Sequence, residues 1–228
     1  MPQTLRSKKG KSIYSVHPGV AMVQDWIARL KDKTGRTLEE WIDLIQESGP
    51  ETEKERREWL KKEYNLGTNS AWWLAERAAG KGSEDGDAET YLQAAEKYVE
   101  AQYAGGKAHL RPIYDRLLHV AFQLGDDVKA CPCQTIVPLY RHHVFAQIKP
   151  TTQSRIDLGL ALGNRKTPKR LIDTGGFAKK DRITHRIPLE SANEIDKEVE
   201  RWLKTAYDLD EARSLCYPQS HRGHRENG

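Results

Sequence analysis

The chain has 228 residues, of which 37% are hydrophobic and 31% are charged, and its mean hydropathy is −0.78. This length fits one large or two small domains, and no uncharged apolar run approaches the roughly 20 residues that cross a bilayer. The basic N-terminus lacks a following apolar stretch, which argues against a secretory signal. Three cysteines, an odd number, disfavour a disulfide framework, so we expect a cytoplasmic protein with no membrane partner.

The net charge of +4, from 37 Lys and Arg against 33 Asp and Glu, is distributed unevenly. Residues 81–106 carry 2 basic and 6 acidic side chains, whereas residues 107–182 carry 14 basic and 6 acidic ones. A concentrated basic segment attracts polyanions or acidic partners through its long-range field, although lysines and arginines also keep ordinary loops solvated. The basic excess therefore directs the search for a binding site to the second half of the chain.

Residues 13–80 have the periodicity of a small helical bundle. Apolar residues recur three and four positions apart in four successive segments, which is the spacing of helices that bury one stripe. Thr37 with Glu40, and Thr52 with Glu55, have the spacing of capping boxes that begin helices. The segment carries 10 basic and 12 acidic side chains, which disfavours a DNA-reading helix-turn-helix.

The helical segment contains five of the six tryptophans. They are Trp26, Trp41, Trp59, Trp72 and Trp73. Their spacing is typical of a packed core. Because Trp73 directly follows Trp72, the two lie on different faces of one helix, and we expect Trp73 to be exposed and to mark a groove for a protein partner.

The region after residue 80 begins with a glycine-rich, acidic stretch, so residues 81–106 are predicted to be a linker with a connecting helix. A helix over 110–124 follows, and then the period changes to about two. This change predicts four strands. They cover 135–140, 144–149, 155–162 and 182–189.

The remaining signals complete an α+β fold: a small helical bundle, then a helix, a mostly antiparallel four-stranded sheet and a final helix. Pro138 and Pro188 cannot donate to a strand ladder, so we expect them at edges, bulges or strand ends. Ser191 with Glu194 is a third capping box, expected to open the last helix. The α+β domain is predicted over 107–212, with a disordered polar tail over 213–228.

Several phrases resemble a family of uncharacterised bacterial two-domain proteins. KTGRTLEEWIDLI, GPETEKERREWLKKEYNLG and WWLAERAAG resemble its small N-terminal helical domain of unknown function. LGDDVKA, VFAQIKPTTQSRIDLGLAL and THRIPLESANEIDKEVERWLKTAY resemble its C-terminal domain of unknown function, which is sometimes labelled "predicted transport protein". The resemblance implies a bacterial, cytoplasmic, two-domain protein and transfers no catalytic residues.

Cys131, Cys133, His142 and His143 are the most suggestive group for a metal site. Zinc sites usually space paired cysteines by two to four residues, whereas a single proline separates these two. Adjacent histidines on a strand also face opposite sides. We therefore expect buried thiols and turn histidines, with no metal and no cofactor.

An enzyme that acts on a small anionic substrate is one alternative. A cysteine nucleophile needs a nearby histidine, and Cys133 before the first strand could meet His185 on the fourth, near Arg155. The sequence lacks the G-x-S-x-G, P-loop, H-E-x-x-H and G-x-G-x-x-G motifs, so the enzyme interpretation has no further support.

The strongest candidate for a binding site is a set of eight cations from the third predicted strand and the segment after it. They are Arg155, Arg165, Lys166, Lys169, Arg170, Lys179, Lys180 and Arg182. Phe177 among them, or Tyr140 on the first strand, could stack on a base. We expect a non-catalytic protein whose basic C-terminal domain recognises an anionic ligand, with nucleic acid as one candidate. A solvated loop, and an adaptor that only binds proteins, are the alternatives.

Overall fold

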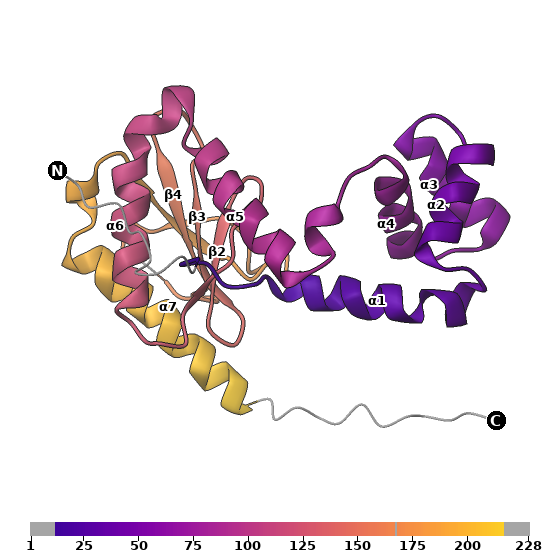
Figure 1. Cartoon of the computed structure of the whole chain (residues 1–228). Helices are drawn as coiled ribbons and strands as arrows, with labels where there is room; N and C mark the ends of the chain where they lie inside the picture. The colour runs from indigo at the N-terminus through magenta and orange to yellow at the C-terminus, as the bar shows by residue number, and fades with distance from the viewer. Residues whose placement is uncertain (1–11, 167, 217–228) are drawn as a thin grey trace. The chain divides into compact units, whose positions relative to one another are not determined.

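The computed structural model describes residues 12–166 and 168–216, with the side chains of 212–216 left out, and it forms two compact units (Figure 1). The first unit is Val16–Ala94. The second contains residues 12–15 and 95–216 of the described chain. The division falls within helix α5 (Ala88–Gln102). No helix in these ranges is long and apolar enough to cross a bilayer.

Four helices form most of the first unit, as the apolar periodicity predicts. They are α1 (Pro18–Thr34), α2 (Leu38–Ser48), α3 (Glu53–Tyr64) and α4 (Thr68–Ala78), with a short turn, η1 (Ser83–Asp85), before α5. At Thr37 the capping box is complete, because its hydroxyl accepts the Glu40 N–H and the Glu40 carboxylate accepts the Thr37 N–H. At Thr52 only half of the box forms, because the Glu55 carboxylate accepts from the Thr52 hydroxyl instead of the backbone.

The core of the helical unit is apolar and aromatic. Trp41 is 1% exposed, its ring meets Tyr64 edge-on at 5.1 Å, and its Nε1 donates to the Thr34 hydroxyl at 2.8 Å. Buried aliphatic side chains complete this core: Leu30, Ile45, Leu60, Ala71, Leu74, Ala75 and Ala78. Every helix from α1 to α4 therefore contributes at least one buried apolar side chain to this core.

The prediction that Trp73 is exposed was wrong. Its ring packs edge-on against Trp26, with the centroids 4.9 Å apart, and Trp26 donates its Nε1–H to Ser70. Trp72 is the exposed member of the pair, at 43%, and its ring lies 5.9 Å from the Arg57 guanidinium. Trp73 is only partly exposed, because Trp26 on α1 packs against it. Helical periodicity does not predict this contact, which joins residues 47 positions apart.

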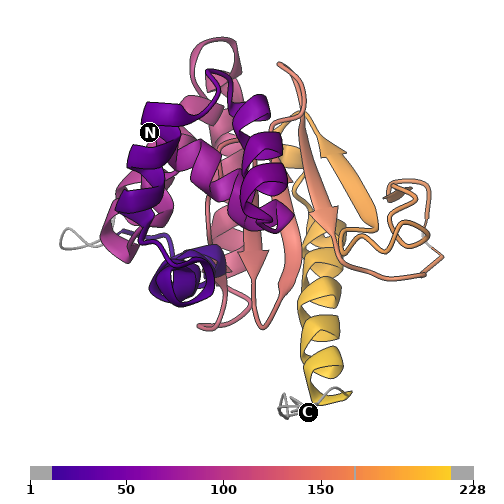
Figure 2. The ribbon, with the colours of Figure 1, turned by 90° about the vertical axis from the view of Figure 1, so that its right-hand side faces the viewer.

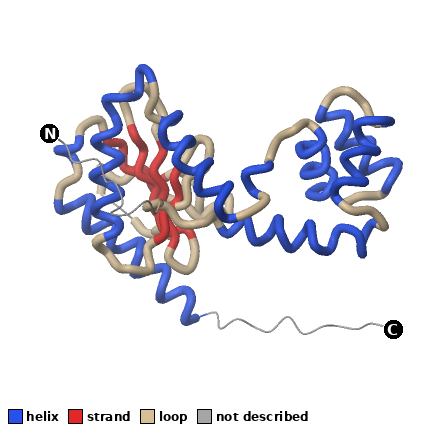
Figure 3. The backbone as a smooth tube through the Cα atoms, viewed as in Figure 1, coloured by secondary structure: helices blue, strands red, loops and turns tan. Residues whose placement is uncertain are grey.

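The second unit contains the predicted helix–sheet–helix arrangement. Its helical elements are the end of α5, η2 (Gly105–Leu110), α6 (Arg111–Phe122), η3 (Ala192–Glu194) and α7 (Lys197–Cys216). Its strands are β1 (Lys129–Ala130), β2 (Val137–Tyr140), β3 (Val144–Lys149), β4 (Ile156–Leu160), β5 (Ile172–Asp173) and β6 (His185–Leu189). The strands form one antiparallel sheet in the order β1-β2-β3-β4-β6-β5. Figure 3 draws the strands in red.

The sheet has two strands more than predicted. β1 and β5 each have two residues, too few to show an alternating pattern, and each lies at an edge. The prolines lie where no strand needs their N–H. β5 pairs only with His185 and Arg186 of β6, so Pro188 lies beyond that pairing. Pro138 lies beyond the residues of β2 that pair with β1, and its carbonyl accepts the Cys131 N–H. Helix α7 packs against β3 and β4 and buries the predicted apolar stripe.

The third capping box forms, but it does not open the last helix. Ser191 and Glu194 cap η3, and α7 begins at Lys197, where Asp196 accepts the Glu198 and Val199 N–H groups. The helix continues to Cys216, which shortens the tail predicted over 213–228; the rest of that tail lies outside the described residues.

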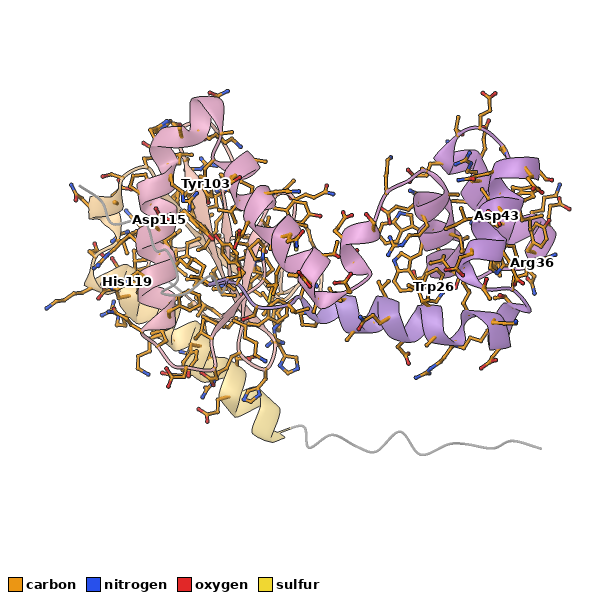
Figure 4. All side chains as sticks on the ribbon, viewed as in Figure 1. Trp26, Arg36, Asp43, Tyr103, Asp115 and His119 are labelled. Carbon is orange, nitrogen blue, oxygen red and sulfur yellow. The ribbon has the colours of Figure 1, made fainter. Side chains whose placement is uncertain are left out.

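A small aromatic cluster joins the start of the described chain to α6. The Tyr114 hydroxyl donates to the Tyr14 hydroxyl at 3.1 Å, and the Tyr103 ring lies 4.9 Å from the Tyr114 ring (Figure 4 labels Tyr103). All three side chains are buried, and burial raises the pKa of each phenol above its usual value, so this cluster is a neutral part of the core.

Candidate anion-binding surface

The eight predicted cations fall into two groups, because three of them are in ion pairs. Arg170 contacts Asp196 at 2.5 Å and Glu198 at 3.3 Å, both at the start of α7. Arg182 pairs with Asp210 on the same helix and donates its Nε–H to the Val144 carbonyl at 2.6 Å. These contacts tie the segment after β4 to α7, so Arg170 and Arg182 are structural cations.

Arg155 is the third paired cation, and it lies at the opposite end of β4. Its Nε is 3.0 Å from Asp157, whose side chain is buried. Asp157 also accepts from the Thr151 hydroxyl at 2.8 Å and from Arg186 at 2.9 Å. β4 is five residues long, which at about 3.4 Å per residue separates Arg155 from the segment after β4 by roughly 17 Å.

The other five cations lie between β4 and β6, in the described residues 161–166 and 168–184, a segment that includes β5 and that we call the basic loop. In Figure 2 the orange segment that contains it projects from one edge of the sheet. The five side chains are exposed, and within the described chain none of them forms an ion pair. They are Arg165, Lys166, Lys169, Lys179 and Lys180.

The basic loop has a defined backbone. The Thr174 N–H donates to the Thr184 carbonyl at 3.0 Å, and the Asp181 N–H donates to the Gly176 carbonyl at 2.8 Å. Lys180 has φ +60°, in the left-handed region that side chains other than glycine rarely adopt. These bonds close a turn that carries Lys179 and Lys180.

The two candidate aromatic residues lie in different places. Phe177 is on the basic loop and is 56% exposed, so its ring is available beside the lysines. Tyr140 ends β2, and β3, β4 and β6 separate it from β5. Burial raises the pKa of Tyr140 to about 12. The structure therefore retains Phe177 as a stacking candidate and separates Tyr140 from it.

The residues considered for an enzyme site do not come together. His185 is buried, with Nδ1 2.9 Å from the Thr184 hydroxyl and Nε2 3.1 Å from the Arg165 carbonyl, so both ring nitrogens already have polar contacts. Cys133 precedes β2, at the opposite end of the sheet and about three strand spacings, or roughly 14 Å, from β6. Cys133 and His185 therefore cannot form a hydrogen-bonded nucleophile–base pair.

The cysteines and histidines considered for a metal site also have other contacts in the structure. Cys131 is buried, and burial raises the pKa of its thiol to about 12. His142 and His143 form the β2–β3 turn, and both backbone N–H groups donate to the buried Asp210 carboxylate at 2.9 Å. Over the described ranges, no three His, Cys, Asp or Glu side chains gather as metal ligands would.

The sequence interpretation missed two cations on the sheet. Lys149 and Arg186 lie on β3 and β6 at positions that alternate with buried Ile148 and Ile187, and they flank Asp157 on β4. Strand alternation could have found them, because a cation within an apolar run marks the face turned away from the core.

Two family models match the chain. Residues 22–79 match a domain of unknown function, DUF4287, and residues 99–210 match a second one, DUF5655. The chain is thus a two-domain protein built from two domains of unknown function, as the resemblance implies. Neither match includes a transport label. Searches of curated proteins and of solved structures gave no match.

Proposed function

We propose that the α+β unit binds an anionic polymer through the basic loop and that single-stranded nucleic acid is its ligand. The observation that carries this proposal is the contrast between paired and unpaired cations. Arg170 and Arg182 hold the loop against α7, while five further cations and Phe177 are exposed on it. Exposed cations interact with phosphates, and an exposed aromatic ring can stack on any base.

The defined backbone of the basic loop adds to this support. The turn that carries Lys179 and Lys180 is already closed by backbone hydrogen bonds, so this part of the loop loses less conformational entropy when it binds a ligand. We further propose that the protein is cytoplasmic and bacterial, on the basis of its odd cysteine number and the phrases described above. The helical unit is proposed to contact a protein partner through exposed Trp72 and Met22.

Salt-dependent binding tests the proposed function. The full chain is titrated into a fluorescently labelled single-stranded DNA of about 15 nucleotides at several salt concentrations. The test variant replaces four lysines of the basic loop with alanine. These are Lys166, Lys169, Lys179 and Lys180. We expect affinity to fall at least tenfold at low salt and the slope of log K against log salt to decrease by about 3, since each phosphate contact to a single strand contributes roughly 0.7.

A matched variant controls for net charge. It replaces four exposed lysines of the helical unit, so both variants lose the same formal charge. These are Lys31, Lys33, Lys54 and Lys62. The control variant is expected to keep wild-type affinity within about twofold. Equal losses in the two variants would show non-specific attraction and would refute the proposal, as would unchanged binding in the loop variant.

A further inference from the structure

A cavity of about 560 Å³ lies at the end of the sheet opposite the basic loop. Its walls come from the end of α5, from η2, from the turn before β2 and from the β3–β4 hairpin, all within the second unit. Its volume falls within the roughly 300–1,000 Å³ typical of small-molecule sites. The ten lining residues include two lysines, three glutamines and a threonine, and none of these ten is acidic.

Gln102 is the most informative of the lining residues. It is 93% buried, and its Nε2 donates to the Cys133 carbonyl at 2.7 Å, which fixes the amide. Its Oε1 is buried and has no hydrogen-bond partner within the described chain. A buried amide oxygen without a donor is costly, so this acceptor is expected to receive an N–H or O–H from a bound molecule.

Two lysines give the cavity its charge. Lys107 donates to the Pro150 carbonyl at 2.7 Å, which fixes its ammonium group at the wall. Lys149 ends β3 and is exposed, so it can move toward an anionic group. Lys149 lies opposite Asp157 in the β3–β4 pairing, but Arg155 and Arg186 already pair with that carboxylate. Since no lining residue is acidic, the two ammonium groups favour a negatively charged ligand.

The remaining lining residues suit hydroxyl groups. Gln134 and Gln153 each carry an amide that can both donate and accept, and Thr135 carries a hydroxyl that can do the same. Gly106 keeps space for Gln153, because a Cβ at residue 106 would lie 2.3 Å from the Gln153 amide oxygen. Mixed donors and acceptors match a molecule with several hydroxyls better than an apolar one.

We propose that this cavity binds a small polyhydroxylated anion, a sugar phosphate or a sugar acid, with its anionic group on Lys149 and Lys107 and a hydroxyl on Gln102. The cavity is separated from the basic loop by the length of β4, so this site is independent of the proposed polymer binding. A phosphate and a carboxylate would be recognised by the same two lysines. The phosphate carries the larger charge, so the sugar phosphate is expected to bind more tightly than the sugar acid.

The test uses three probes with one carbon skeleton. Glucose 6-phosphate, gluconate and glucose are titrated into the full chain by calorimetry at low and moderate salt. We expect glucose 6-phosphate to bind with a Kd below about 1 mM, gluconate several-fold more weakly, and glucose at least tenfold more weakly than the phosphate, as the loss of a charge-assisted contact predicts. Binding of neither anion up to 10 mM would overturn the proposal, and so would equal binding of all three probes.

Variants locate the site. Lys149→Met keeps most of the side-chain volume and is expected to weaken glucose 6-phosphate binding about tenfold, while Lys149→Arg restores it. Lys169→Met, on the basic loop, is the matched control and should leave this binding unchanged. If both Met variants weaken binding equally, the anion binds elsewhere and the cavity is refuted. Gln102→Met should weaken glucose 6-phosphate as well, and its unfolding midpoint, measured in parallel, separates lost binding from lost folding.

This experiment and the DNA titration give separate answers. A chain that binds glucose 6-phosphate but not DNA supports the cavity and refutes the proposed function. A chain that binds DNA but not glucose 6-phosphate supports the proposed function and refutes the cavity. When both bind, saturating DNA should leave the Kd of glucose 6-phosphate unchanged within about twofold. Complete displacement would place both ligands on one surface and overturn the assignment to the cavity.

Discussion

The two units of this protein use aromatic and charged residues in different ways. In the helical unit, Trp41 and Trp26 are core residues, while ion pairs such as Arg29–Asp25 lie on the surface, with 60% and 55% of their side chains exposed. In the α+β unit, two carboxylates are buried instead, Asp157 at 8% and Asp210 at 2% exposed. Asp210 accepts from the distant His142–His143 turn and pairs with Arg182, and Asp157 pairs with distant Arg186 as well as with nearby Arg155.

This difference determines where each unit is vulnerable. Exposed ion pairs contribute little, so the helical unit depends on apolar packing and on local caps. In the α+β unit, Asp210 joins the His142–His143 turn and Arg182 to α7, and removing it leaves an arginine and two backbone N–H groups without their acceptor. The stability of the helical unit should therefore fall most when a buried apolar side chain is shortened. The stability of the α+β unit should fall most when a buried carboxylate is removed.

Replacement of Trp41 by Ala is the largest expected effect. It removes a fully buried ring, its edge contact with Tyr64 and its hydrogen bond to Thr34, and should lower the free energy of unfolding of the helical unit by about 3–5 kcal/mol. Urea unfolding followed by tryptophan fluorescence reports this unit, which holds five of the six tryptophans. Trp72→Ala, at an exposed position of the same unit, should cost less than about 1 kcal/mol.

The comparison between the units fails if Trp41→Ala destabilises the α+β unit equally. Hydrogen exchange of the β3 and β4 amides measures that unit separately, because central strands open only with global unfolding of their unit. We expect their protection to change by less than about tenfold in Trp41→Ala. A loss of protection as large as that in the helical unit would mean that the two units unfold as one.

Replacement of Asp210 by Ala should be the second-largest effect, and in the other unit. Breaking a buried ion pair costs about 3–5 kcal/mol when the remaining charge stays buried, and Arg182 is partly exposed, so we expect about 3 kcal/mol. The matched control is Asp208→Ala, two residues earlier on α7, whose pair with Lys204 is exposed and should contribute less than about 1 kcal/mol. Similar losses in both variants would contradict the structural role of Asp210.

Helices were the most predictable part of this fold, because their signals span three or four residues. The stripe of α2 and its Thr37–Glu40 cap are written within one segment of the sequence. β1 and β5 were missed since a two-residue strand is defined only by the neighbour that pairs with it. The helical bundle therefore follows from local rules, whereas the edges of the sheet follow from tertiary contacts.

The candidate site was predictable only as a list of cations. The charge count located a basic segment. The partners that neutralise Arg170 and Arg182 lie 26 to 28 residues away, on α7 or just before its first residue, with no periodic relation to these arginines. The cavity at Gln102 was missed for the same reason, because its walls come from four segments between residues 101 and 153. Charge composition shows which segment would attract an anion. Only the tertiary structure shows which of its cations are already in ion pairs and which are exposed.

The smallest expected effect is a pH dependence confined to the helical unit. His17 precedes α1, and its Nδ1 accepts the Gly19 N–H at 2.9 Å, which requires an unprotonated nitrogen. Burial lowers the pKa of His17 below its usual 6.5, while Asp85 partly opposes the shift. Protonation is then favoured in the unfolded chain, so the stabilising contribution is complete above pH 6.5 and declines as pH falls below that value.

Replacement of His17 by Asn tests this dependence, because asparagine caps a helix without titrating near neutral pH. Between pH 7.5 and 5, the wild-type helical unit should lose about 1 kcal/mol of unfolding free energy more than the variant does, measured by urea unfolding at each pH. His119→Asn, on the exposed side of α6 in the other unit, should leave the pH dependence of the helical unit unchanged. If His17→Asn follows the wild-type pH profile, the His17 cap does not control the pH dependence of the helical unit. The contrast between local caps in the helical unit and ion pairs between distant residues in the α+β unit would then lose this evidence.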